Sequence, residues 1–150
     1  MVCNNSFQYV IGNWKKSSFT RATLLNALCM ICRNENREIN PLAVSRLLHN
    51  NGPYIVYQEI KSIGIDSLKV SQHGFDLLYM FLKQSSKVSE VFECKKLISL
   101  LGKHFKFHIY SGDIVERSAA VLSLLATEYS NCYHLFYTLK PGNYVLLCIV

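Results

Sequence analysis

The chain has 150 residues, of which 50% are hydrophobic and 17% are charged. This composition excludes an intrinsically disordered protein, and the length predicts a single globular domain over residues 1–150. The net charge of +6 comes from lysines and arginines scattered along the sequence, which is not the dense basic stripe of a dedicated nucleic-acid-binding protein.

The first elements alternate between extended and helical patterns. Residues 7–11 are rich in β-formers and predict a short strand or extended segment. Residues 19–33 carry leucines and isoleucine at helical spacing, which predicts a helix with Ser17 or Ser18 as its N-cap.

Two further segments are expected to be helical before the middle of the chain. One helix is predicted to begin at Pro41 and to end at Asn51-Gly52, because proline favours the first turn and glycine the end of a helix. Residues 53–64 are compatible with a helix or a strand, and we favour a helix. Residues 66–74 indicate a loop with some strand character.

The following segment leads from helices to a predicted strand. Residues 75–84 and 85–105 both predict helices, the second with Gly102 near its C-terminus. Apolar and polar residues then alternate over 105–110, which is the pattern of a half-buried strand. Residues 114–130 carry mixed signals for helix and strand.

The C-terminal stretch predicts a β-hairpin. Apolar runs over 134–139 and 144–150 flank Lys140-Pro141-Gly142-Asn143, whose proline and glycine favour a turn. With helices first and strands afterwards, and with no sequence repeat, the chain is expected to be an α+β domain. Its helices would pack on a small, largely antiparallel sheet that ends in this hairpin.

The cysteines favour reduced thiols and no metal site. The N-terminal residues lack the basic and apolar regions of a secretory leader, so we expect an intracellular, cytoplasmic protein with free thiols. Cys29 and Cys32 form a CxxC pair without a second pair, and we interpret them as buried apolar side chains. Zinc ligation completed by His49, Cys94 or His104 is not supported by any recognised spacing.

Two other groupings of histidine and cysteine contain candidate functional residues. His104 and His108 would share one face of the predicted strand, as a basic surface or as a pair of ligands, and we favour the basic surface. Cys132 and His134 place a thiol and an imidazole on the same face of a strand. This spacing is weak evidence for a nucleophile and base, which usually come from different elements.

The order of elements resembles the ovarian-tumour (OTU) family of papain-like cysteine proteases, many of which are deubiquitinases. Three stretches carry the resemblance over about residues 9–148: "KKSSFTRATLLNAL", "SEVFECKKLISLLGKHFKFHIYSGD" and "LFYTLKPGNYVLL". They are similar to the nucleophile-bearing loop and helix, to a helix leading into a central strand, and to the terminal hairpin of that family. The resemblance implies a papain-like fold.

The residues that the resemblance aligns with the catalytic positions are not catalytic types. The nucleophile position falls on Ser18 and the base position on Asn143. A serine without a strong base is a poor nucleophile, and an asparagine side chain does not exchange a proton near neutral pH. The resemblance therefore implies a degenerate, catalytically inactive domain.

Such a domain is expected to act as a binding or regulatory module, without a cofactor or metal and without a membrane span. The resemblance suggests ubiquitin or a ubiquitin-like protein as its partner. Two alternatives stay open: an active cysteine hydrolase that uses Cys132 or Cys29 with a nearby histidine, and a basic protein that associates with RNA or the ribosome. The residues expected to contact a protein partner are Trp14, Phe19, Lys140 and Tyr144.

Overall fold

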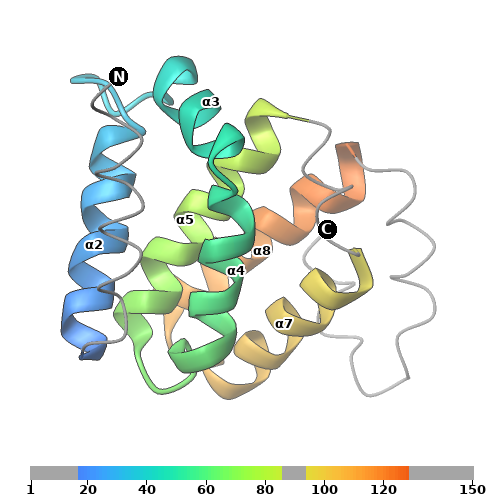
Figure 1. Cartoon of the computed structure of the whole chain (residues 1–150). Helices are drawn as coiled ribbons and strands as arrows, with labels where there is room; N and C mark the ends of the chain where they lie inside the picture. The colour runs from blue at the N-terminus through green and yellow to red at the C-terminus, as the bar shows by residue number, and fades with distance from the viewer. Residues whose placement is uncertain (1–16, 86–93, 129–150) are drawn as a thin grey trace.

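The computed structural model describes residues 17–85 and 94–128 of the chain, and these residues form six helices (Figure 1). No strand occurs in the two described ranges, where an isolated bridge joins Arg33 to Ile39 in a loop. No described helix is long and apolar enough to cross a membrane. The helices are α2 (Ser18–Ile31), α3 (Pro41–His49), α4 (Gly52–Ile63), α5 (Leu68–Gln84), α7 (Cys94–Phe107) and α8 (Gly112–Glu128).

The prediction of an α+β domain with a papain-like cysteine-protease fold is therefore wrong for the described residues. The strand expected over 105–110 is the end of α7 and the turn that follows it. The mixed segment that begins at residue 114 is helical through Glu128 in α8. The expected strand at 7–11 and the C-terminal hairpin over 134–150 lie outside the described residues.

The helices at the start of the described chain confirm the sequence signals. Ser17 is the N-cap of α2, and its Oγ accepts a hydrogen bond from the backbone N–H of Thr20 at 3.3 Å. Asn40 caps α3 in the same way, and Pro41 occupies its first turn. Asn51 separates α3 from α4 with a left-handed φ of 60°, a conformation that asparagine tolerates better than most residues. The predicted helix over 53–64 is confirmed as α4.

The segment 66–74 is not a loop, because α5 begins at Leu68 and includes most of it. Gly74 and the buried polar side chain of Ser71 obscure the helical pattern there. A Cβ atom at Gly74 would lie only 2.5 Å from Cγ1 of Ile60, so the missing side chain is what allows α5 to pack closely on α4. The predicted helix over 75–84 is confirmed as the second half of α5.

The alternation over 105–110 does not correspond to a buried face of a strand. Phe105 is buried together with Leu97 and Leu101, which precede it at the four-residue spacing of a helix. The other two apolar residues of the pattern, Phe107 and Ile109, are exposed. Helical packing thus overrides a short period-two pattern.

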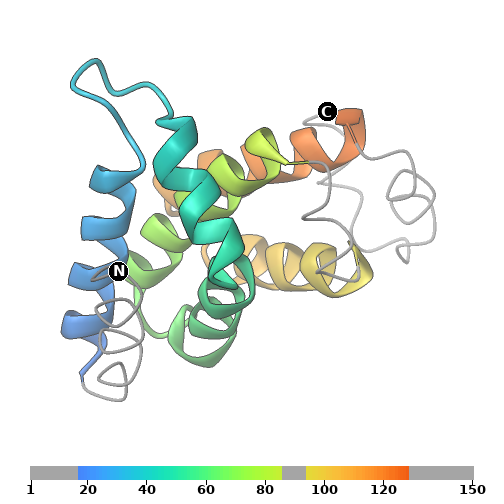
Figure 2. The same cartoon turned by 45° about the horizontal axis from the view of Figure 1, so that its top comes forward.

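The central helix of the described structure is α5, which lies between α2 on one side and α8 on the other (Figures 1 and 2). α4 packs on α5, and α7 packs on α8, so that the chain forms two helical hairpins side by side. Buried side chains from all six helices join one hydrophobic cluster, in which α5 supplies the largest share. Among them, Phe75, Leu77, Leu78 and Phe81 are fully buried.

The hairpin of α4 and α5 recurs as the hairpin of α7 and α8 with an offset of 44 residues. α4 and α7 end 44 residues apart, and α5 and α8 begin and end 44 residues apart. Equivalent positions are buried in both second helices, although residues 52–84 and 96–128 share only three identical residues. This offset lies within the range of α-solenoid repeats, in which neighbouring helical units stack. The equivalent buried pairs are Val70/Ile114, Gly74/Ser118, Leu77/Val121, Leu78/Leu122, Met80/Leu124 and Phe81/Leu125.

Candidate functional site

The predicted nucleophile position, Ser18, is an exposed side chain in the first turn of α2. Its neighbour Ser17, rather than Ser18, caps the helix. Phe19 is 79% exposed, and its contact with a partner stays a prediction. Asn143 lies outside the described residues, so the pairing of Ser18 with Asn143 stays a prediction. The same holds for the other predicted residues outside the described ranges, which are Trp14, Cys132, His134, Lys140 and Tyr144.

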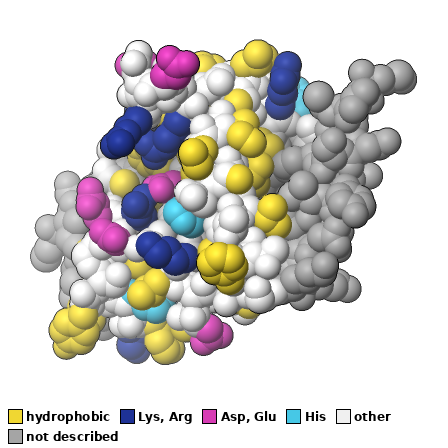
Figure 3. All heavy atoms as spheres, turned by 90° about the vertical axis from the view of Figure 1, so that its left-hand side faces the viewer, with side chains coloured by type: hydrophobic (Ala, Val, Ile, Leu, Met, Phe, Trp, Pro, Cys, Tyr) yellow, Lys and Arg dark blue, Asp and Glu magenta, His cyan; other side chains and the backbone are white. Residues whose placement is uncertain are grey.

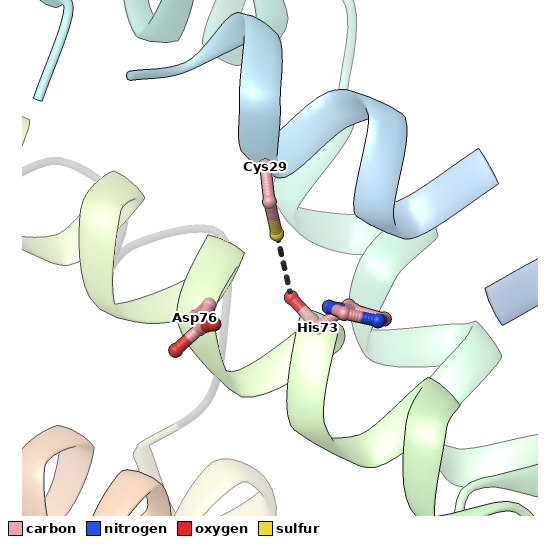
Figure 4. Close-up of side chains that lie close together, drawn as sticks. All are labelled: Cys29, His73 and Asp76. Atoms are coloured by element: carbon pink, nitrogen blue, oxygen red, sulfur yellow. Dashed lines mark hydrogen bonds between the residues drawn. The ribbon is translucent and has the colours of Figure 1, made fainter. Parts of the chain in front are cut away.

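Cys29 of the CxxC pair meets a histidine and an aspartate that the sequence did not single out (Figure 4). His73 and Asp76 stand three residues apart on α5, and Cys29 projects toward them from α2. The thiol sulfur, a ring nitrogen and a carboxylate oxygen all lie within 4.8 Å of one another. We call these three residues the Cys29 cluster. In the described ranges, no other group of three or more cysteine, histidine and acidic side chains is this close.

Hydrogen bonds and charges around the cluster hold its members in place. The Sγ of Cys29 donates to the backbone carbonyl of His73 at 3.3 Å. Oδ1 of Asp76 forms an ion pair with Nη1 of Arg117 from α8. Burial, followed by the negative charges of Asp76 and Cys32, raises the pKa of Cys29 to about 12. Burial also lowers the pKa of His73, so its ring is neutral at physiological pH.

This arrangement bears on catalysis by Cys29. A thiol with a pKa of about 12 is protonated at neutral pH, whereas a catalytic cysteine needs a stabilised thiolate. Burial likewise raises the pKa of Cys32 to about 11. Both thiols are buried, as the sequence predicted, but Cys29 also lies beside the charged side chain of Asp76.

A groove between α4 and α7 holds the other concentration of functional side chains. Its volume is about 500 Å³. Lys61, Lys96 and Lys103 are exposed along it, and none of its described lining residues is an aspartate or a glutamate. We call it the α4–α7 groove. The remaining lining residues are Tyr57, Ile65, Ser99, Leu100 and His104.

His104 lines this groove and is fully buried. Its Nδ1 lies 3.1 Å from Oγ of Ser71, which in turn donates a hydrogen bond to the carbonyl of Gly64 at 2.7 Å. Among the described residues, the buried Nε2 atom has no hydrogen-bond partner. The ring of Phe75 packs edge-on against the imidazole, with ring centroids 5.3 Å apart. These contacts join the end of α4, the start of α5 and the last turn of α7.

The environment of His104 disfavours its charged form. Burial is the main cause, and the charges of His108 and Lys103 act in the same direction, so that the pKa falls to about 4. The carbonyl of Ile60 acts in the opposite direction. His104 is thus neutral at physiological pH. Because its side chain lies on a helix and is buried, the predicted basic strand face shared by His104 and His108 is wrong.

The surface at the α2 end of the molecule carries charges of both signs. Basic, acidic and hydrophobic side chains are interspersed on this face, without a field of one charge (Figure 3). Nucleic-acid-binding surfaces normally cluster their lysines and arginines. This face of the described structure therefore does not resemble such a surface.

Comparison with known proteins gives no relative: no family model, curated protein or solved structure matches the chain. The resemblance to the OTU family therefore stays a prediction from sequence. Functional interpretation has to start from the chain's own geometry.

Sequence reasoning missed the Cys29 cluster and the α4–α7 groove for identifiable reasons. The three-residue spacing of His73 and Asp76 places two ligand types on one helix face, but residues 66–74 were predicted to be a loop. Lys96 and Lys103 appeared scattered in sequence. They share a groove with Lys61 only because the two hairpins pack side by side.

Proposed function

We propose that the chain is a protein-binding module built from helical repeats, and that its α4–α7 groove receives an acidic segment of the partner. The observation that carries this proposal is that two exposed lysines, Lys61 and Lys103, lie along one groove whose described lining residues include no carboxylate. Lysines arranged in this way attract carboxylates and phosphates and repel basic segments.

The repeat architecture supports the same function. Stacked helical units form extended surfaces, and proteins with this architecture commonly bind their partners along them. The α4–α7 groove lies where one hairpin meets the next, so its walls come from equivalent helices of the two units. The state of Cys29, a buried and protonated thiol, favours binding over hydrolysis by this residue.

A fluorescein-labelled oligoglutamate peptide provides a direct test in a fluorescence-anisotropy titration. We expect saturable binding that weakens as salt is added, because the contacts are between exposed charges. The double variant Lys61→Glu/Lys103→Glu should lower the affinity about tenfold, since two attractive contacts become repulsive. The matched control is Lys69→Glu/Lys106→Glu, which changes the net charge equally at two exposed lysines outside the groove and should bind like the unaltered chain.

Two further ligands in the same assay separate this proposal from the alternatives. Fluorescent ubiquitin tests the partner suggested by the sequence resemblance. Binding that is lost in the groove variant but not in the control would identify ubiquitin as an occupant of the groove. Oligouridylate tests the RNA alternative: tighter binding than oligoglutamate, with a steep salt dependence, would overturn the proposal in favour of a nucleic-acid partner. Equal affinities of the groove and control variants for oligoglutamate would also overturn it.

A further inference from the structure

The Cys29 cluster is independent of the α4–α7 groove, and its residue types are those of a metal centre. Cysteine sulfur, imidazole nitrogen and carboxylate oxygen are the three protein ligand types of Zn²⁺. Cys29 comes from α2, whereas His73 and Asp76 come from α5. We propose that Cys29, His73 and Asp76 form a zinc(II) site that joins α2 to α5.

The distances within the cluster fit this assignment. The three ligand atoms lie within 4.8 Å of one another, so rotations of the His73 and Asp76 side chains bring all three to one ion. A bond length of about 2.0–2.3 Å to each ligand completes three corners of a tetrahedron. His73 and Asp76 are half-buried, so the fourth corner is open to a water molecule. Three protein ligands and one water are the ligand set of an accessible zinc site rather than of a closed structural one.

Arg117 supports the ligand geometry from outside the cluster. Its guanidinium contacts Oδ1 of Asp76, and this ion pair orients the carboxylate. A carboxylate has two oxygens, so this pairing leaves Asp76 one oxygen for the ion. Carboxylates that bind a metal through one oxygen and a donor through the other are common around metal sites, and such outer partners tune the affinity.

Zinc binding releases one proton from the cluster. The S–H bond of Cys29 breaks, an Sγ–Zn bond forms, and the proton leaves to solvent. The resulting thiolate and the carboxylate of Asp76 supply two negative charges to Zn²⁺, and Arg117 adds one positive charge beside that carboxylate. The neutral form of the His73 ring has a lone pair available for the ion.

The test is titration of Zn²⁺ and Co²⁺ into the metal-free full-length chain. We expect one equivalent of Zn²⁺ to bind and to raise the melting temperature, because the metal binds the folded chain. Co²⁺ should show a thiolate-to-metal charge-transfer band, the signature of a sulfur ligand. Cys29→Ser should abolish that band, and His73→Gln should weaken Zn²⁺ binding at least tenfold.

Cys32→Ser is the matched control, since Cys32 is also a buried thiol of the CxxC pair but is not a member of the cluster. It should keep the Co²⁺ band and the Zn²⁺ affinity. His73→Gln leaves every cysteine in place, so a loss of affinity in this variant separates the cluster from the other thiols of the chain. The proposal is overturned if His73→Gln binds Zn²⁺ as tightly as the unaltered chain, or if Cys32→Ser loses the band as Cys29→Ser does.

Discussion

Gly64 is the position where a single added methyl group should do most damage to the junction of α4, α5 and α7. It follows the last residue of α4 with φ −62° and ψ −30°, a conformation that alanine adopts without strain. The cost of Gly64→Ala is therefore steric. A Cβ atom there would lie 2.5 Å from the carbonyl oxygen of Ile60, 2.6 Å from Oγ of Ser71 and 2.9 Å from Cε1 of His104.

The size of the effect follows from the contacts that must move. Overpacking in a filled interior costs about 1–3 kcal/mol. Displacing Ser71 also weakens its 2.7 Å hydrogen bond to the carbonyl of Gly64, which adds about 1 kcal/mol. The expected loss in the free energy of unfolding is thus about 2–4 kcal/mol, or a fall in melting temperature of about 5–15 °C for a chain of this length.

Gly112→Ala is the matched control, because Gly112 begins α8 and a Cβ there meets no atom within 4 Å. This variant should be neutral, or more stable by up to about 1 kcal/mol through the loss of backbone freedom in the unfolded chain. Thermal and urea unfolding followed by circular dichroism measure both variants. Equal melting temperatures for Gly64→Ala and Gly112→Ala would falsify the steric reasoning.

A double-mutant cycle measures the share of the clash that falls on Ser71. Ser71→Ala should cost about 1–3 kcal/mol alone, because it leaves the Gly64 carbonyl and the His104 Nδ1 without their buried partner. Combined with Gly64→Ala, it removes one of the two oxygens that the new methyl group meets, while the carbonyl of Ile60 stays in place. The double variant should then be more stable than the sum of the two single effects by at least about 0.5 kcal/mol. Strict additivity would show that Ser71 is not the obstacle.

Two further predictions concern the cap of α2 and the ionisation of His104. Ser17→Ala should lower the free energy of unfolding by about 1 kcal/mol, whereas Ser18→Ala should change it by no more than about 0.5 kcal/mol, as measured by urea unfolding. The reverse order of the two effects would assign the cap to Ser18. Because the pKa of His104 is about 4 in the folded chain and 6.5 unfolded, the unfolded state binds more protons between these values. The free energy of unfolding should thus fall by about 3 kcal/mol as the pH drops from 6.5 to 4. His104→Gln should remove most of this dependence of stability on pH. An unchanged pH dependence in His104→Gln would refute a buried neutral ring.

The described helices differ in how well their sequences predicted them. α2, α3 and α4 were predictable, because caps and prolines mark their starts and their buried residues keep helical spacing. The first half of α5 was not, since Gly74 and Ser71 stand at buried positions where a pattern search expects large apolar residues. The neighbours in the folded chain explain both residues. Gly74 leaves room for the side chain of Ile60, and the hydroxyl of Ser71 forms hydrogen bonds with Gly64 and His104.

The repeat was hidden for a related reason. Packing conserves the size and burial of side chains at equivalent positions, not their identity, so Val70 corresponds to Ile114 and Gly74 to Ser118. The hydroxyl of Ser118 is accommodated because it donates to the carbonyl of Ile114 within its own helix. An alignment of the two hairpins by residue identity finds almost no match, whereas the pattern of buried positions repeats after 44 residues.

Both proposed sites depend on α5, and they use opposite sides of it. Successive residues of an α-helix are rotated by about 100°, so Ser71 and His73 point roughly 160° apart around the axis. Ser71 supports His104 in the wall of the α4–α7 groove, and His73 belongs to the Cys29 cluster on the α2 side. A ligand in the groove therefore binds at the interface between the two hairpins, whereas zinc binds at the interface between α2 and α5. The two interfaces share the helix α5 but no side chain. We therefore expect Lys61→Glu/Lys103→Glu to leave Zn²⁺ binding unchanged, and His73→Gln to leave oligoglutamate binding unchanged.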